Sequence, residues 1–169
     1  MSNKDPILFE NINFNNIVHY KIKDTNGKKI IYLKYKNGET LEDLVTQTPT
    51  LWSTKKPTKL GANLHDLEIE LIGKRQDKTN NFIQFLKNLD KFIIDSAKEN
   101  AVSWFKNVDN VTYLNTIRES VDNDVNKNYI KLKIIKSVDF KTLLKLDNKT
   151  KLKVNDIKEN YWMKSIIQI

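Results

Sequence analysis

Lysine and aromatic residues recur in this sequence at positions where they could act on one common ligand. The candidates are Lys21, Lys23, Tyr32, Lys34, Trp52, Lys55, Lys56, Lys59, Tyr129, Lys131 and Lys133. Lysine ammonium groups neutralise phosphates, and flat tyrosine and tryptophan rings stack on unpaired bases. We therefore expect these side chains to converge on one open groove. There the lysines would hold a nucleic-acid backbone while Tyr32, Trp52 and Tyr129 stack bases.

Alternating segments of the sequence must position most of these side chains. Apolar residues alternate with polar residues, mostly lysine, in residues 17–23, 29–35 and 129–135. Successive side chains of a strand point to opposite faces, so each segment offers an apolar face to a core and a lysine face to water. Asn26-Gly27 predicts a hairpin between the first two segments. An ordinary half-buried sheet in a lysine-rich protein has the same pattern, so both interpretations stay open.

The composition limits the class of partner. The chain has 169 residues and a formal net charge of +8, which favours a polyanion. Its basic residues are lysine except for Arg75 and Arg118, and this scarcity of arginine argues against sequence-specific reading of a duplex. Lysine, asparagine and isoleucine are also what AT-rich codons specify, so base composition is a second explanation of the charge.

The chain is expected to fold as one mainly β domain with a long helix. The repeat of apolar residues predicts a helix near 81–106, and strands precede and follow it. We expect an irregular lead-in over residues 1–16 and a single domain over 17–169, shaped as a small β-barrel of the oligonucleotide-binding (OB) type capped by the helix. Residues 118–128 are polar and are expected to form a loop. Trp104, Phe105 and Trp162 are expected in the core.

No motif for catalysis, metal or cofactor binding is recognisable. The chain has no cysteine, and its two histidines, His19 and His65, lack metal-binding spacing. The carboxylate pair Glu68/Glu70 fits an exposed strand face better than acid–base chemistry. The chain also lacks an apolar run of membrane-spanning length, and residues 1–6 lack the apolar core of a secretion signal. We expect a protein that is neither an enzyme nor secreted, without cofactor or membrane association.

Several short motifs occur in an order that resembles a known family. They are Gln47-Thr48-Pro49-Thr50-Leu51-Trp52, Lys59-Leu60-Gly61, the alternating Leu67–Ile72, Phe82-Ile83-Gln84-Phe85-Leu86-Lys87-Asn88-Leu89-Asp90 and Asn100-Ala101-Val102-Ser103-Trp104-Phe105. This order, over roughly residues 30–169, resembles single-stranded DNA-binding-like proteins of nucleocytoplasmic large DNA viruses. Those proteins are similar to the OB-fold single-stranded DNA-binding proteins of short-tailed phages.

The resemblance implies an OB fold, a single-stranded DNA ligand and a role in viral DNA replication, either at the replication site in the host cytoplasm or in the virion. RNA stays open as a ligand. The chain departs from the phage proteins because it ends in the apolar segment Tyr161–Ile169 and not in an acidic tail. Such an end favours an alternative, a structural or interaction protein of the virus particle that self-associates or binds other viral proteins. A further alternative is an inert regulator that docks on a replication enzyme.

Overall fold

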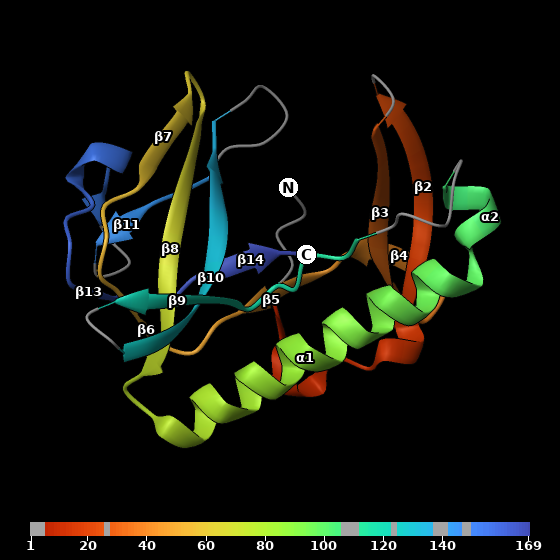
Figure 1. The fold of residues 1–169 in the computed structure, drawn as a ribbon, viewed down its shortest axis with the longest axis horizontal. Coiled ribbons are helices and arrows are strands. Elements are labelled where there is room, and N and C mark those ends of the chain that lie inside the picture. Colours follow the sequence, from red (N-terminus) through yellow and green to blue (C-terminus); the bar gives the residue numbers. More distant parts are fainter. Residues whose placement is uncertain (1–5, 26–27, 106–111, 123–124, 137–141, 147–149) are drawn as a thin grey trace. The chain divides into compact units, whose positions relative to one another are not determined.

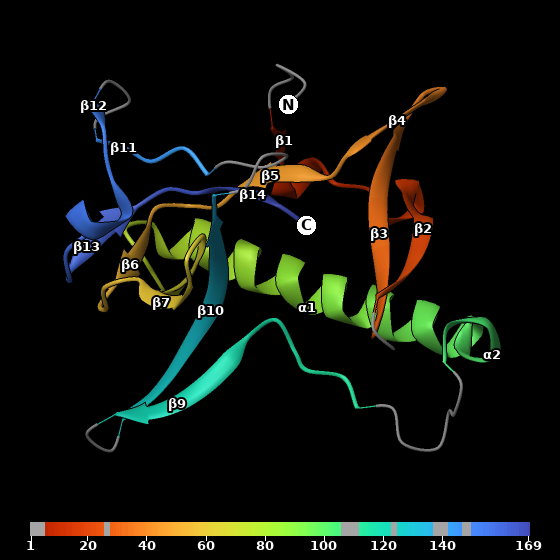
Figure 2. The same cartoon turned by 90° about the horizontal axis from the view of Figure 1, so that it is seen from above.

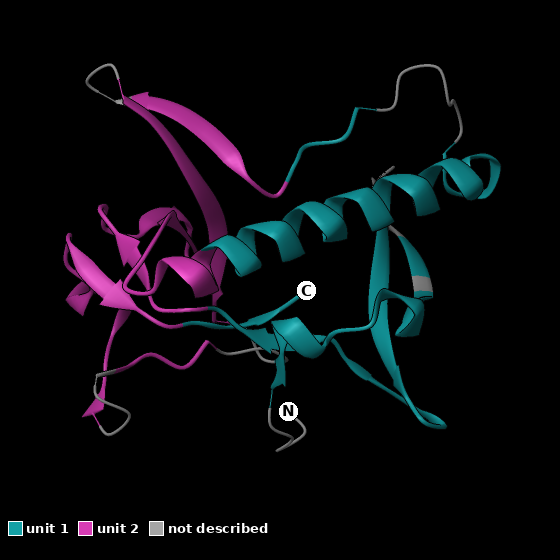
Figure 3. Cartoon of the chain, turned by 90° about the horizontal axis from the view of Figure 1, so that it is seen from below, with its two compact units in different colours: residues 1–48, 80–115, 165–169 teal, residues 49–79, 116–164 magenta. Residues whose placement is uncertain are grey.

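The computed structural model describes residues 6–25, 28–105, 112–122, 125–136, 142–146 and 150–169. They form a mainly β structure with one long helix, as the sequence predicts (Figure 1). Contacts divide the chain into two compact units whose segments interleave along the sequence (Figure 3). Unit 1 comprises residues 1–48, 80–115 and 165–169, and unit 2 comprises residues 49–79 and 116–164. The predicted division into a lead-in and one domain stays a prediction.

Unit 1 contains two three-stranded sheets. The first has the order β2 (Ile17–Thr25), β3 (Lys28–Asn37), β4 (Thr40–Asp43), and all its strands are antiparallel. The predicted hairpin of the first two strands is thereby confirmed. The second sheet has the order β1 (Ile7–Leu8), β5 (Val45–Gln47), β14 (Ile166–Gln168), with β1 parallel and β14 antiparallel to β5. The C-terminal strand is therefore paired within its own chain.

The long helix begins earlier and ends earlier than predicted. Helix α1 spans Gln76–Glu99, and the short helix α2 spans Ala101–Trp104. The first turn is polar and so escapes the apolar repeat, but its acidic residue Asp77 suits the positive end of the helix dipole. Asn100 separates the two helices and donates a side-chain hydrogen bond to the Ser96 carbonyl oxygen. Among the described residues, neither helix is both long and apolar enough to cross a bilayer.

Aromatic rings form the core of unit 1. The apolar stripe of α1 buries Phe82, Phe85, Leu86 and Leu89. Phe9, in the 3-10 helix Phe9–Asn11, meets the ring of Phe82 edge-on at a centroid distance of 5.2 Å. A second 3-10 helix, Phe14–Asn16, brings Phe14 to 5.9 Å from Phe85. Such pairs stabilise the core beyond the area that they bury.

The alternation predicted for β2 is wrong at its centre. The register of β2 and β3 shifts between His19 and Lys21, where a β-bulge inserts Tyr20. His19, expected on the lysine face, instead stacks on Phe92 at 5.8 Å and meets Trp104 edge-on at 4.7 Å. Tyr20, expected in the core, is 57% exposed. An extra residue reverses the faces on either side of it, and strict period-two counting misses this reversal.

Unit 2 is organised around one six-stranded sheet. Its path runs β13 (Tyr161–Met163), β6 (Leu51–Ser53), β8 (Leu64–Gly73), β10 (Val125–Ile135), β9 (Arg118–Asp122), and β7 (Thr58–Gly61) also pairs with β8. One face buries apolar residues of the central strands, namely Leu51, Leu67, Ile69, Ile130 and Ile134. The short hairpin β11 (Lys145–Leu146) and β12 (Thr150–Lys151) and the 3-10 helix Val154–Asp156 complete the unit.

The loop predicted over residues 118–128 is wrong, because this segment forms β9 and the start of β10. The two strands pair antiparallel and extend as a hairpin (Figure 2). Val121 and Val125 are both exposed, so the segment lacks the buried face that would mark a strand in the sequence. Each described sheet is open at its edges and none closes into a barrel, so the OB-type barrel stays a prediction.

Candidate nucleic-acid interface

The predicted site residues lie in two different sheets. Lys21, Lys23, Tyr32 and Lys34 belong to the β2–β3–β4 sheet of unit 1. The six-stranded sheet of unit 2 and its loops hold the others, namely Trp52, Lys55, Lys56, Lys59, Tyr129, Lys131 and Lys133. The predicted residues therefore form two groups, one in each unit.

The group in unit 1 combines one exposed ring with a lysine that has internal partners. Lys21 pairs with Tyr32 in the strand register, and Tyr32 is 43% exposed. Lys34 forms an ion pair with Asp43 of β4, and its Nζ lies 5.6 Å from the centre of the Tyr20 ring. Lys23 is exposed. A phosphate at Lys34 would have to compete with the Asp43 carboxylate.

The group in unit 2 follows a row across the sheet. Trp162 of β13 pairs with Trp52 of β6, Trp52 with Glu70 of β8, and Glu70 with Tyr129 of β10. Directly opposed residues of an antiparallel sheet share one face, so this row lies opposite the buried apolar face. Neighbouring strands are about 4.8 Å apart, and the row therefore spans roughly 14 Å. We call this side of the sheet the outer face of unit 2.

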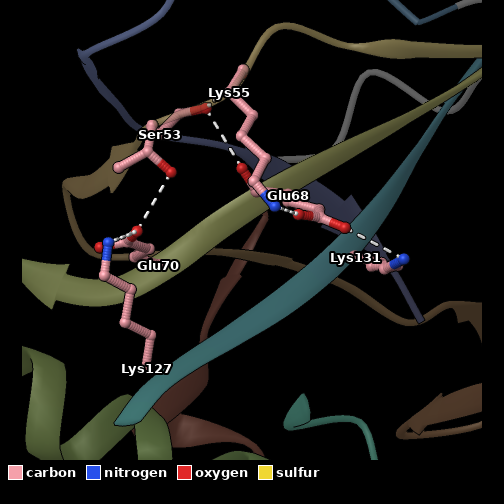
Figure 4. Close-up of polar contacts among 7 residues, drawn as sticks. Ser53, Lys55, Glu68, Glu70, Lys127 and Lys131 are labelled. Carbon is pink, nitrogen blue, oxygen red and sulfur yellow. Dashed lines mark hydrogen bonds and ion pairs between the residues drawn. The ribbon is translucent and has the colours of Figure 1, made fainter. Parts of the chain in front are cut away.

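The lysines of β10 on this outer face have carboxylates beside them. Lys131 lies opposite Glu68, with an ion pair of 3.0 Å, and Lys133 forms an ion pair with Asp66. Lys55 also contacts Glu68, at 2.8 Å, so that one carboxylate lies between two ammonium groups (Figure 4). The predicted lysine stripe is therefore a ladder of ion pairs. The sequence places Glu68 and the lysines of β10 on exposed strand faces, but it does not indicate that the two strands are neighbours.

These contacts fix the protonation states of the ladder. The hydrogen bond from Lys55 lowers the pKa of Glu68, and a further bond from Lys131 adds to this effect while partial burial opposes it. The same hydrogen bond to Glu68 raises the pKa of Lys131. Both residues are therefore charged at neutral pH, and Lys131 is less available to a phosphate than an isolated lysine would be.

The exposed aromatic groups of unit 2 gather at the β13 edge of the sheet. The rings of Trp52 and Trp162 meet edge-on at 4.8 Å, and Trp162 is 40% exposed. The core position predicted for Trp162 is therefore wrong. Lys74 lies over the Trp162 ring, with its Nζ 5.6 Å from the ring centre. This edge combines an accessible indole with an adjacent cation. Trp52 is among the sequence-predicted site residues, whereas Trp162 and Lys74 are not.

Two lysines at this edge are exposed and have no ion pair within the described part of the chain, namely Lys74, which lies over the Trp162 ring, and Lys164, which follows Trp162 by two residues. Lys59 and Lys158 of unit 2 are also exposed without a described ion pair, but Lys59 pairs with His65 in the register and so lies on the face opposite the outer face. Lys56 contacts Glu159 at 3.7 Å, but both side chains are more than half exposed, so this pair is weak. Phosphates would meet less internal competition here than along the β8–β10 ladder.

The net charge is distributed unevenly between the units. Unit 2 contains 18 of the 29 basic residues and 11 of the 21 acidic residues, which gives it +7 of the net charge of +8. Unit 1 is thus almost neutral. Because a field of one sign attracts a polyanion, unit 2 is the electrostatically favoured half for a nucleic acid.

Comparison with known proteins gives no further guide to the site. No protein-family model, curated protein or solved structure matches the chain. The family resemblance drawn from short motifs therefore stays a prediction. Among the described residues, no group of three or more histidine, aspartate or glutamate side chains is arranged to hold a metal ion.

Proposed function

We propose that this protein is not an enzyme and binds single-stranded DNA, largely without sequence preference, through the outer face of unit 2. The observation that carries the proposal is the edge-on Trp52/Trp162 pair, whose exposed indole has Lys74 over its ring. Every base has a flat face, so such a ring can stack on any sequence. The unpaired lysines beside it supply phosphate contacts in the unit that carries nearly all of the net charge.

The proposed DNA contacts lie at the β13 edge and not at the lysines of β10. Lys131 and Lys133 each have a carboxylate partner, whereas Lys74 and Lys164 have none among the described residues. An exposed sheet edge is sufficient for stacking, so the proposal does not depend on an OB-type barrel, which stays a prediction. A role in viral DNA replication, in the host cytoplasm or the virion, is part of the proposal and is supported by the sequence resemblance alone.

Fluorescence anisotropy of a labelled oligothymidine across a range of salt concentrations tests the proposal. Affinity should fall with salt, with a logarithmic slope near −0.7 for each phosphate contacted. Trp162→Ala should weaken binding by roughly 1–3 kcal/mol without changing the slope. Lys74→Gln should make the slope shallower by about 0.7. Absence of binding at low salt, or an affinity that does not respond to salt, would refute the proposal.

Two matched controls come from unit 1. Tyr32→Ala removes an aromatic residue that is as exposed as Trp162, and Lys87→Gln removes an exposed lysine of α1. If only the outer face of unit 2 binds, neither variant changes affinity or slope. A loss with Tyr32→Ala would show that the sequence-predicted group of unit 1 contributes as well.

A second function, a structural or interaction protein of a virus particle, is favoured by the free face of the β2–β3–β4 sheet. This face exposes large side chains together, namely Tyr20, Ile30, Tyr32 and Leu41. Extended exposed apolar surface is typical of protein contacts. The C-terminal strand, expected to seek a partner, is already paired with β5. Sedimentation with and without oligonucleotide separates the functions, because a constitutive assembly that ignores DNA supports the structural role.

A further inference from the structure

A shallow hollow lies on the outer face of unit 2, one strand beyond the tryptophan pair. Its volume is about 230 Å³, and its lining includes Thr54, Lys55, Glu68, Glu70, Lys127 and Tyr129. Two lysines and two carboxylates leave the lining without net charge, so the hollow is a poor phosphate site. Its mixture of donors and acceptors suits a neutral, polar group instead. If the proposed function holds, the neutral and polar part of the ligand is the base.

Glu70 is the most buried polar side chain of this hollow. Its side chain is only 10% exposed. The Thr54 hydroxyl donates to Glu70 Oε1 at 3.1 Å. Lys127 Nζ contacts the same oxygen at 3.3 Å (Figure 4). Glu70 Oε2 has no partner among the described residues. Every fully buried side-chain oxygen in the described residues has a hydrogen-bond partner, so Oε2 must be accessible to solvent. The hollow thus presents a fixed acceptor beside an ammonium donor.

We infer that this hollow is a base subsite of the proposed single-strand interface and that it selects guanine. An ionised carboxylate only accepts hydrogen bonds. Guanine has two adjacent donors, N1–H and the N2 amino group, next to the O6 acceptor. Its donors match the Glu70 carboxylate and O6 matches Lys127 Nζ. Adenine and cytosine offer one amino group on this edge, and thymine offers one imide N–H.

Tyr129 borders the subsite and is less exposed than Trp162. Lys131 Nζ lies 5.9 Å from the centre of the Tyr129 ring and also holds Glu68. Selection at this subsite comes from hydrogen bonding at Glu70, while stacking on the strand comes from Trp162. The interface would then be largely sequence-independent, with one position that prefers guanine.

The test compares a labelled all-thymine oligonucleotide with one that contains isolated guanines, using the full chain at fixed salt. The guanine-containing strand should bind about fivefold tighter or more, the lower end of the discrimination by a good bidentate contact. Glu70→Gln replaces one acceptor by a donor and should abolish this preference, and any change in affinity caused by the lost negative charge should be equal for the two strands. Glu119→Gln is the matched control, because Glu119 is an exposed carboxylate of β9 outside the hollow, and it should keep the preference.

The outcomes separate this inference from the proposed function. Equal affinity for both strands, a preference for another base, or a preference that survives Glu70→Gln would overturn the guanine subsite while leaving single-strand binding intact. Absence of binding to either strand would overturn both. Competition on the unmodified protein gives a second measurement that needs no variant. Guanosine monophosphate should displace the guanine-containing strand at a lower concentration than thymidine monophosphate, and equal potency would contradict the inference.

Discussion

Glu68→Gln should change stability and DNA affinity in opposite directions. In the wild type the Glu68 carboxylate contacts Lys55 at 2.8 Å and Lys131 at 3.0 Å. The variant loses both pairs. Since each pair includes a substantially exposed lysine, each contributes up to about 1 kcal/mol, and the free energy of unfolding should fall by roughly 0.5–2 kcal/mol. A chain of this size would then melt about 1–8 °C lower.

The same substitution frees two ammonium groups for phosphates. A phosphate on the far side of either ammonium group lies roughly 6 Å from the Glu68 charge, and in water their repulsion is about 0.7 kcal/mol. Removing it for one or two phosphates should tighten binding by about threefold to tenfold. The salt slope should also become steeper by up to about 1.4, because two more phosphates are contacted.

Anisotropy titration and thermal unfolding of the same preparation check this prediction. Asp95→Asn is the control, because it changes the net charge equally and breaks the 2.7 Å ion pair with Lys91 on α1, in unit 1. It should not change affinity beyond the small effect of net charge. If Glu68→Gln binds DNA no better than Asp95→Asn, the bound DNA does not reach the ion-pair ladder, and the interface is confined to the β13 edge with Trp52 and Trp162.

Two further predictions concern the fold. Gly73→Ala should lower the free energy of unfolding by roughly 1–3 kcal/mol in urea unfolding, because the new Cβ would lie 1.9 Å from Oγ1 of the buried Thr79. Gly61→Ala is the control, because its Cβ meets open space, and it should change this free energy by under about 0.5 kcal/mol. Although His19 as a whole is exposed, partial burial of its ring lowers its pKa below 6.5, and the nearby Glu99 opposes this. Because the pKa of His19 is lower in the folded protein than in the unfolded chain, the neutral ring contributes stability above pH 6.5. This contribution is lost as the pH falls through the pKa of the folded protein. His19→Phe should make the melting temperature less dependent on pH below 6.5. If the melting temperatures of the variant and the wild type fall in parallel with pH, His19 is not the group responsible.

Local pattern was sufficient to predict much of this fold. The alternation around Asn26-Gly27 predicts the β2–β3 hairpin, and the apolar repeat predicts most of α1, because both signals come from neighbours in sequence. The ion-pair ladder was not predictable in this way. It depends on Lys131 lying opposite Glu68, which are 63 positions apart, and no local rule sets that register. Trp162 was misplaced for a related reason, since a strand at the edge of a sheet leaves exposed an indole that a central strand would bury.

The uneven charge of the two units bears on why the chain is basic. Codon composition acts on the whole chain alike, yet the acidic residues divide almost equally, 10 in unit 1 and 11 in unit 2, while the basic residues divide as 11 and 18. The excess of lysine therefore lies in the unit that also exposes the tryptophan edge. The near-neutral unit 1 instead exposes the apolar sheet face.

The two candidate functions therefore involve different units and can be tested independently. Lys74→Glu with Lys164→Glu, in unit 2, should abolish oligonucleotide binding by reversing charge where phosphates are proposed to lie, and should leave the sedimentation coefficient unchanged. Ile30→Ser with Leu41→Ser, in unit 1, removes exposed apolar side chains and should reduce any self-association without changing DNA affinity. If either pair changed both properties, binding and assembly would share one surface, and the assignment of one function to each unit would be wrong.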